Sequence, residues 1–337
     1  MIQVLLLLIA AWSALVAHEC GHIVAGLLLR FRFGILVVGP FWLVREGRRV
    51  RLRWRFVPAA FGGVALAYPT DPRNLGFRIA AYAGGGPAAS LAVALGAYAI
   101  AVWLPPETSF ARFASALAIV SAGVLLATVQ PWGTGMGVPS DGGRVLLYLS
   151  RRHVAEAEAA VQALDALAAG GVRPRDWSQA LVEQAVAVNE PPAMALAAGT
   201  SLLRQQLDRG DFADAGDTVD RLIPIYDKVP ALLRGDSAAE FSFFLSFVRR
   251  NPSAASEYLE DAAHPLTERH RVLRAQAAVL LRSGDTEGAT VAAGRALAAL
   301  DGALMDVTAL DRDLIEAVQH ELASLQVPVR AGSQGAV

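Results

Sequence analysis

The chain has 337 residues, of which 54% are hydrophobic and 18% charged, with a mean hydropathy of +0.39. Its formal net charge of −1 excludes a polyelectrolyte that grips nucleic acid by bulk positive charge. A single cysteine excludes an intramolecular disulfide. The hydrophobic excess lies before residue 150, whereas the chain after Arg151 reads like a soluble helical protein.

Three apolar segments reach the roughly 20 residues needed to cross a hydrocarbon core of ~30 Å. They cover about residues 2–29, 76–104 and 112–129. The first has no Lys or Arg ahead of it and continues past His22, so we interpret it as a retained transmembrane helix and not as a signal peptide. We therefore predict a mainly α protein whose residues 1–150 form a polytopic membrane domain.

Arginine placement predicts the orientation of this domain. Ten arginines lie from Arg30 to Arg78, against two acids, whereas the connection from Pro105 to Ala111 holds only Glu107 as a charged residue. By the positive-inside bias, the amino terminus faces outward and everything after residue 131 faces the cytosol. We expect a multi-pass protein in contact with the lipid bilayer of the plasma membrane.

Between the first two spans, residues 33–66 are expected to form β-structure. Phe33–Val44 and Val50–Phe56 flank a turn at Glu46-Gly47 and predict a membrane-associated hairpin. Apolar residues alternate with arginines throughout the second stretch, which is typical of a strand with one apolar and one cationic face. Such a hairpin can lie on the inner membrane surface with its arginines toward lipid phosphates, or it can be an ordinary half-buried hairpin.

Residues 151–328 show an Ala-rich helical pattern with breaks at Gly210-Asp211, Arg249–Pro252 and Gly284-Asp285. The second break lies 34 residues before the third, which is the period of tetratricopeptide-like helical repeats. We predict a helical-repeat domain that binds a protein partner or a second copy of the chain through its concave surface. Residues 329–337 are expected to be disordered, and four histidines to lie on the surface: His153, His264, His270 and His320.

His18-Glu19-Cys20-Gly21-His22 has the pattern H-E-x-x-H within the first apolar segment. Residues four apart share a helix face, so His18 and His22 can hold one zinc ion with Glu19 beside it as a general base for peptide hydrolysis. Ionisable groups inside a membrane span cost roughly 2.5–3.5 kcal/mol each and mark functional sites. The alternatives are a polar cluster that joins helices and a proton relay without metal.

A hydrolytic zinc site needs a third protein ligand and an open position. Asp141, in Pro139-Ser140-Asp141-Gly142-Gly143-Arg144, follows the third span and returns to the cytosolic side, the depth expected for His18 and His22. Asp141 also precedes a helical run and can act as its N-cap. We predict that His18, His22 and Asp141 are the ligands of one Zn²⁺.

These features resemble the site-2 proteases, a family of intramembrane zinc metallopeptidases. The H-E-x-x-H helix, the segment ending in Phe61-Gly62-Gly63-Val64, the run Gly84–Ser90 and the motif Pro139–Arg144 match the family in order over residues 1–150. The resemblance implies a metalloendopeptidase that cleaves a transmembrane or membrane-associated protein near the cytosolic face, in regulated proteolysis or signalling. It also implies that His18, His22 and Asp141 are ligands and Glu19 the catalytic carboxylate.

The resemblance further implies that Gly86 and Pro87 bind substrate. The family usually has asparagines at two further positions, where this chain has Ser90 and Gln130, and these would take over any contact with the substrate. The rival hypotheses are a catalytically inactive membrane adaptor that recruits partners through its repeat domain, and a metal or proton transporter, for which three spans leave little room. An extended substrate that pairs with the hairpin edge is an additional hypothesis.

Overall fold

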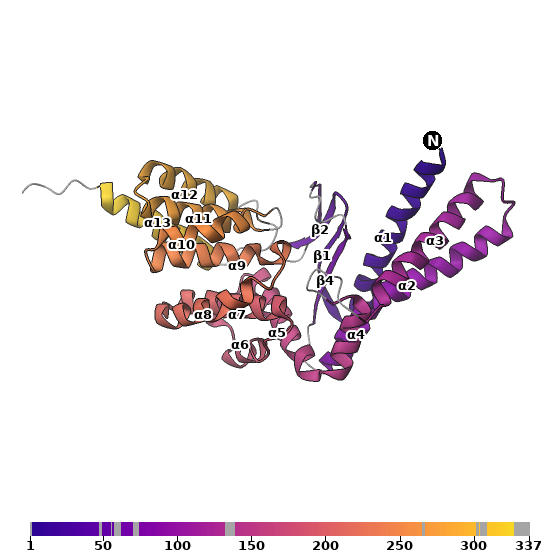
Figure 1. The fold of residues 1–337 in the computed structure, drawn as a ribbon, viewed down its shortest axis with the longest axis horizontal. Helices are drawn as coiled ribbons and strands as arrows, with labels where there is room; N and C mark the ends of the chain where they lie inside the picture. The colour runs from indigo at the N-terminus through magenta and orange to yellow at the C-terminus, as the bar shows by residue number, and fades with distance from the viewer. Residues whose placement is uncertain are drawn as a thin grey trace, which may run out of the picture.

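The computed structural model describes residues 2–46, 49–54, 56, 62–69, 74–131, 139–264, 267–300, 303 and 309–326. Figure 1 shows three long helices at one end of the molecule, a small β-sheet in the middle and a helical domain at the other end. Three predicted features fall on residues outside these ranges. They are Gly47 of the Glu46-Gly47 turn, Phe61 of the glycine turn and the disordered tail 329–337.

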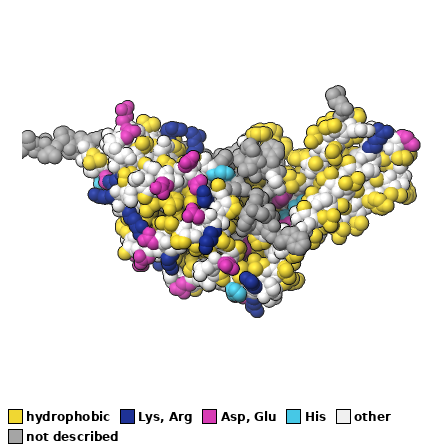
Figure 2. All heavy atoms as spheres, in the orientation of Figure 1, with side chains coloured by type: hydrophobic (Ala, Val, Ile, Leu, Met, Phe, Trp, Pro, Cys, Tyr) yellow, Lys and Arg dark blue, Asp and Glu magenta, His cyan; other side chains and the backbone are white. Residues whose placement is uncertain are grey.

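The three predicted apolar segments are helices, which confirms that part of the fold class. They are α1 (Ile2–Leu28), α2 (Leu75–Trp103) and α3 (Ser109–Val129). At ~1.5 Å per residue even the shortest, with 21 residues, is about 30 Å long, and all three are long and apolar enough to cross a membrane. Figure 2 shows hydrophobic side chains covering their outer surface, with charged ones gathered at the turn between α2 and α3.

Small residues let α1 and α2 approach each other closely. A Cβ built on Gly21 would overlap the carbonyl oxygen of Gly85, and a Cβ on Gly85 would lie 2.6 Å from the Gly21 carbonyl oxygen. Helices in membranes associate through such contacts because they have no hydrophobic driving force of the kind water provides. The contact fixes the part of α1 that carries His18 and His22 against α2.

The β-structure is an antiparallel sheet of four strands, two of which, Phe41–Glu46 and Arg49–Trp54, pair as the predicted hairpin across Glu46-Gly47. With the strands numbered along the chain, their order in the sheet is β3-β2-β1-β4. Phe33–Val44 is not one strand, because the chain reverses at Gly39, whose φ of 60° is in the left-handed region, and at Pro40. A fourth strand pairs with the first and forms the second edge. The strands are β1 (Phe31–Val38), β2 (Phe41–Glu46), β3 (Arg49–Trp54) and β4 (Val64–Pro69).

The alternation predicted for Val50–Phe56 does produce an edge strand, β3, but its apolar face is not covered. Val50, Leu52, Trp54 and Phe56 are 51 to 71% exposed. The interpretation as an ordinary half-buried hairpin is therefore wrong for this strand. Strands β1 and β4 instead pack along α1, and Phe41 of β2 places its ring 5.8 Å from that of Trp12 in α1. The sheet therefore lies beside the lower half of the long helices (Figure 1).

The elements that the structure shows after Val129 are all helices. The breaks predicted at Gly210, Arg249–Pro252 and Gly284 are confirmed, because each separates two helices that pack as a hairpin. Gly210 and Gly284 have φ of 79° and 87°, so a glycine in the left-handed region follows the first helix in two of these three hairpins. The elements are α4 (Asp141–Ser150), α5 (Arg152–Ala169), η2 (Pro174–Asp176), α6 (Gln179–Ala185), α7 (Pro192–Arg209), α8 (Phe212–Tyr226), α9 (Ala231–Phe243), η3 (Phe244–Val248), α10 (Pro252–Ala262), α11 (Arg269–Arg282), α12 (Thr286–Leu300) and α13 (Ala309–Gln326).

A buried ionic network joins the first helices of these hairpins to α13. Arg204 of α7 donates to Asp311 of α13 at 2.9 Å, and Arg274 of α11 donates to Glu240 of α9 at 2.6 Å. His270, 3.5 Å from Asp311, is 2% exposed, so its prediction as a surface residue is wrong. It faces this network and not solvent, because it lies on the side of α11 that packs against α9 and α13.

Candidate metal centre

His18 and His22 lie one turn apart on the buried face of α1. They are 4% and 8% exposed, and their ring centroids are 4.9 Å apart. A continuous helix through this region places the two imidazoles side by side, as the four-residue spacing requires.

Asp141 reaches the same point from a distant part of the chain. Its Oδ2 lies 3.1 Å from Nε2 of His18 and 3.4 Å from Nε2 of His22. Among the described residues, these three side chains form a group whose potential metal-ligand atoms all lie within 4.8 Å of one another. In a tetrahedral site with bonds of about 2.0–2.2 Å, ligand atoms lie about 3.3–3.6 Å apart, close to these distances. The group could hold a metal ion.

At the amino end of α4, the Asp141 carboxylate is not needed to cap the helix. Asp141 is the first residue of α4, and the predicted N-cap role belongs instead to Ser140, whose hydroxyl accepts a hydrogen bond from the Gly143 amide at 3.1 Å. Ser140 also donates to the carbonyl oxygen of Gln130, which ties α4 to the end of α3. Because Ser140 caps the helix, Asp141 can turn its side chain toward α1.

The second ring nitrogen of each histidine is held by α2. Nδ1 of His18 lies 2.9 Å from the Ser90 hydroxyl, and Nδ1 of His22 lies 3.0 Å from the Tyr82 carbonyl oxygen. A carbonyl only accepts, so the contact with Tyr82 is made by the His22 tautomer that carries its proton on Nδ1 and leaves Nε2 for a metal, while the Gly86 amide lies 3.3 Å from the same Nδ1. Outer partners of this kind fix the tautomer and orientation of metal-binding histidines. The donor set therefore fits a divalent metal.

The predicted substrate-binding residues occupy different surroundings. Ser90 is 1% exposed and contacts His18, so the structure supports a role in orienting that ring. Gly86 and Pro87 are buried in α2, with Gly86 directly beside both imidazoles. Gln130 ends α3 and offers its backbone carbonyl to Ser140. Contact of any of the four with a substrate stays a prediction.

Ionisation of Asp141 is favoured by its neighbours. Burial raises the pKa of this carboxyl, but the hydrogen bonds and charges of His18 and His22 outweigh burial, so the pKa lies below its usual range. A carboxylate that stays ionised is the form that binds a metal.

Glu19 is 7% exposed and lies against the glycine turn that precedes β4. A Cβ built on Gly63 would lie 2.7 Å from the carboxyl carbon of Glu19, and the φ of Gly63 is +85°. The sequence places Gly63 in the motif Phe61-Gly62-Gly63-Val64 but gives no sign of its contact with Glu19, which only the structure shows. Gly63 lets the backbone close over Glu19.

The proteolysis expected from the sequence predicts that Gly63→Ala lowers turnover about 10- to 100-fold while the metal stays bound. The alanine Cβ meets the Glu19 carboxylate, and its left-handed φ costs roughly 1–2 kcal/mol. Gly62→Ala is the matched control, because a Cβ at Gly62 has no described atom within 4 Å and should leave turnover unchanged. Cleavage rates of the two purified variants decide this, and equal rates would contradict the assignment.

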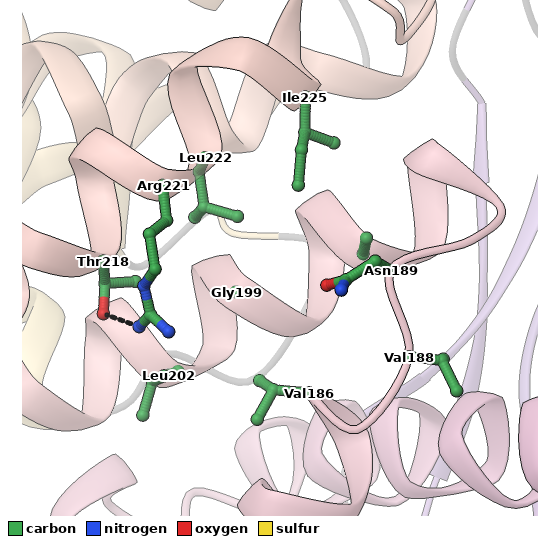
Figure 3. A pocket seen from close by; sticks show the side chains of 10 residues that line it. Val186, Val188, Asn189, Gly199, Leu202, Thr218, Arg221, Leu222 and Ile225 are labelled. Carbon is green, nitrogen blue, oxygen red and sulfur yellow. Dashed lines mark hydrogen bonds between the residues drawn. The ribbon is translucent and has the colours of Figure 1, made fainter.

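A separate hollow lies in the helical domain, between α7, α8 and the segment 186–189 (Figure 3). Its volume is about 330 Å³ and aliphatic side chains dominate its wall, with Arg221 at one side donating to the Thr218 hydroxyl at 3.1 Å. The hollow shares no residue with the metal-ligand group. It holds no cluster of metal-ligand side chains among the described residues.

Comparison with known proteins found no matching family model, no matching curated protein and no matching solved structure.

Proposed function

We propose that this protein is a zinc-dependent endopeptidase that cleaves a transmembrane or membrane-associated protein within the membrane, near its cytosolic face. One observation carries the proposal: two histidines of a membrane-length helix and the carboxylate of Asp141, 119 positions after His22, converge on one point. A cluster that merely joined helices would need no Glu19 beside it.

Each polar group has a distinct task in this proposal. His18, His22 and Asp141 would hold the metal, which when bound supplies a Lewis acid that polarises water and a peptide carbonyl. Glu19 is not a ligand, so its carboxylate is available to accept a proton from water and to deliver it to the leaving amine. Ser90 and the Tyr82 carbonyl keep both Nε2 atoms directed inward.

The proposed setting is the plasma membrane, with the amino terminus outside and the helical domain in the cytosol. The arginines between α1 and α2 support this orientation, since cytosolic connections carry the excess of positive charge. The exposed apolar row on β3 supports contact of the sheet with lipid or with an apolar substrate segment.

A substrate must be locally extended before its amide bonds can be attacked. In the described part of the sheet, β3 pairs only with β2, so its outer edge can accept an extended segment by strand addition. We expect proline at Leu52 or Trp54 to abolish cleavage without unfolding the membrane domain, because proline cannot donate to an added strand. Circular dichroism and thermal unfolding control for folding, and full activity of both variants would exclude such pairing.

The helical domain is proposed to bind a protein partner or a second copy of the chain, and its similarity to tetratricopeptide repeats stays a prediction. Its stacked hairpins support a role in recognition. An inactive adaptor would keep this role and lack proteolysis.

Metal removal tests the proposed function directly. Purified protein should contain one equivalent of zinc, lose cleavage activity on dialysis against a chelator and regain it with one equivalent of Zn²⁺. Asp141→Ala should lower zinc occupancy, whereas Glu107→Ala, in the exposed α2–α3 turn, should not. Metal-free protein that cleaves at the full rate would overturn the proposal, and zinc-loaded protein without proteolysis would favour the adaptor.

A further inference from the structure

The motif that supplies Asp141 also contains Arg144, which the proposed chemistry does not use. Arg144 and Tyr148 lie on the same side of α4 as Asp141, since residues three, four and seven positions apart share a helix face. The Arg144 Nε donates to the Tyr148 hydroxyl at 3.1 Å. Their side chains therefore continue the face that begins at the metal-ligand group.

Glu158 of α5 binds both of these side chains. Arg144 Nη2 donates to Oε1 of Glu158 at 2.5 Å, and the Tyr148 hydroxyl donates to Oε2. Gln162, one turn further along α5, donates to Oε1 at 3.2 Å. Both carboxylate oxygens of Glu158 thus accept hydrogen bonds from side chains of α4. Glu158 itself belongs to α5, the first helix of the domain that the proposed topology places in the cytosol.

The hydrogen-bonded group of Arg144, Tyr148 and Glu158 is partly shielded from solvent, and it packs against the hydrophobic cluster beside the metal-ligand group. The Glu158 side chain is 18% exposed, and Tyr148 is buried in a cluster with Ala155 and Ala159 of α5. Tyr82, whose carbonyl accepts from His22, is in the same cluster. Proximity of Tyr148 and Glu158 raises the pKa of the Arg144 guanidinium, so its charge is permanent. Removing Glu158 would leave this charge without its carboxylate.

The other end of α4 is fixed by α3. A Cβ built on Gly142 would overlap the carbonyl oxygen of Val129, so the first turn of α4 touches the end of α3. Asp141 therefore lies between two supports: α3 on one side and Glu158 of α5 on the other. A short helix of 10 residues held at both ends has little freedom to shift.

We propose that Glu158 is a positioning residue for the metal ligand Asp141. It fixes the rotation of α4 about its axis and the position of α4 along that axis, and in this way it couples the helical domain to the metal centre. The inference uses the proposed metal site, but its main readout is metal affinity and not proteolysis. A partner that moved α5 would act on Asp141 through the same contact.

The test measures affinity for Zn²⁺ by competition with a chromogenic chelator, in the full-length protein. Glu158→Ala should weaken zinc binding about 10-fold, the lower end of the range for groups that hydrogen-bond a ligand directly, because Glu158 acts on Asp141 only through Arg144 and Tyr148 of α4. Tyr148→Phe, which removes one hydroxyl and preserves packing, should weaken it a few-fold. Glu156→Ala is the matched control on α5, because Glu156 pairs with exposed Arg152 one turn away, and it should leave affinity unchanged.

A double-mutant cycle separates positioning from general destabilisation. In the Asp141→Ala background, Glu158→Ala should cause no further loss of zinc affinity, since its effect passes through Asp141. Glu158→Gln, which retains an acceptor oxygen, should recover part of the affinity. The absorption spectrum of the Co²⁺-loaded protein should change with Glu158→Ala and not with Glu156→Ala.

Three results would overturn the inference: unchanged affinity in both Glu158→Ala and Tyr148→Phe, an additive loss in the Asp141→Ala background, or a wild-type protein that binds neither Zn²⁺ nor Co²⁺. If Glu158→Ala does not fold, Tyr148→Phe and Glu158→Gln decide. A wild-type protein that binds zinc but cleaves nothing contradicts the proposed function alone and leaves the positioning role of Glu158 standing.

Discussion

Replacement of Glu19 by glutamine should lower proteolysis by about 10³-fold or more while one equivalent of zinc stays bound. Glutamine keeps the size and one acceptor oxygen of the side chain, but it cannot accept the proton of an attacking water. General bases contribute typically about 10²–10⁴-fold to such reactions. Glu19 does not belong to the metal-ligand group, so the zinc content should not change.

The measurement needs a substrate, and the same variant can supply one. Inactive Glu19→Gln protein should retain bound substrate, so crosslinking in cells followed by mass spectrometry would identify captured membrane proteins. Cleavage of the captured proteins by wild type and by Glu19→Gln is then compared in proteoliposomes. Glu107→Gln is the control, since Glu107 is exposed in the α2–α3 turn. Wild-type rates in Glu19→Gln would remove Glu19 from the mechanism.

The ligand set could be predicted from the sequence because each part has a local signal. His18 and His22 share a helix face by spacing alone, and Asp141 stands out as an acid among glycines after an apolar span. The structure brings the three together. The N-cap of α4 was assigned to the wrong residue, because Ser140 and Asp141 are both common caps and only the geometry distinguishes them.

Contacts between distant segments had no such signal. Nothing in the sequence pairs Ser90 with His18 or Glu158 with Arg144, because these contacts depend on how α2 and α5 pack. The burial of His270 has the same origin, since the sequence of α11 carries no mark of the acids on other helices that face this side chain. The fourth strand, β4, was missed because its pairing with β1 spans the intervening β2 and β3.

The close approach of α2 to both imidazoles predicts a strong effect at Gly86. A Cβ at this position would overlap Nε2 of His22 and lie 2.7 Å from Nε2 of His18. Neither ring can move aside freely, because Ser90 and the Tyr82 carbonyl hold the opposite nitrogens. We therefore expect Gly86→Ala to reduce zinc affinity at least 100-fold and to abolish proteolysis with it.

Gly84→Ala is the matched control for this prediction, measured by the same chelator competition. Among the described residues, its Cβ would meet the Val145 side chain alone, at 3.9 Å, which is ordinary contact. Alanine is favoured over glycine within a helix by about 1 kcal/mol, so both variants gain the same local stability in α2. If only Gly86→Ala loses zinc, the cause is therefore the clash of the added Cβ with His18 and His22 and not a change in the stability of α2. Equal affinity in the two variants would mean that the imidazoles do not occupy their assigned places when the metal binds.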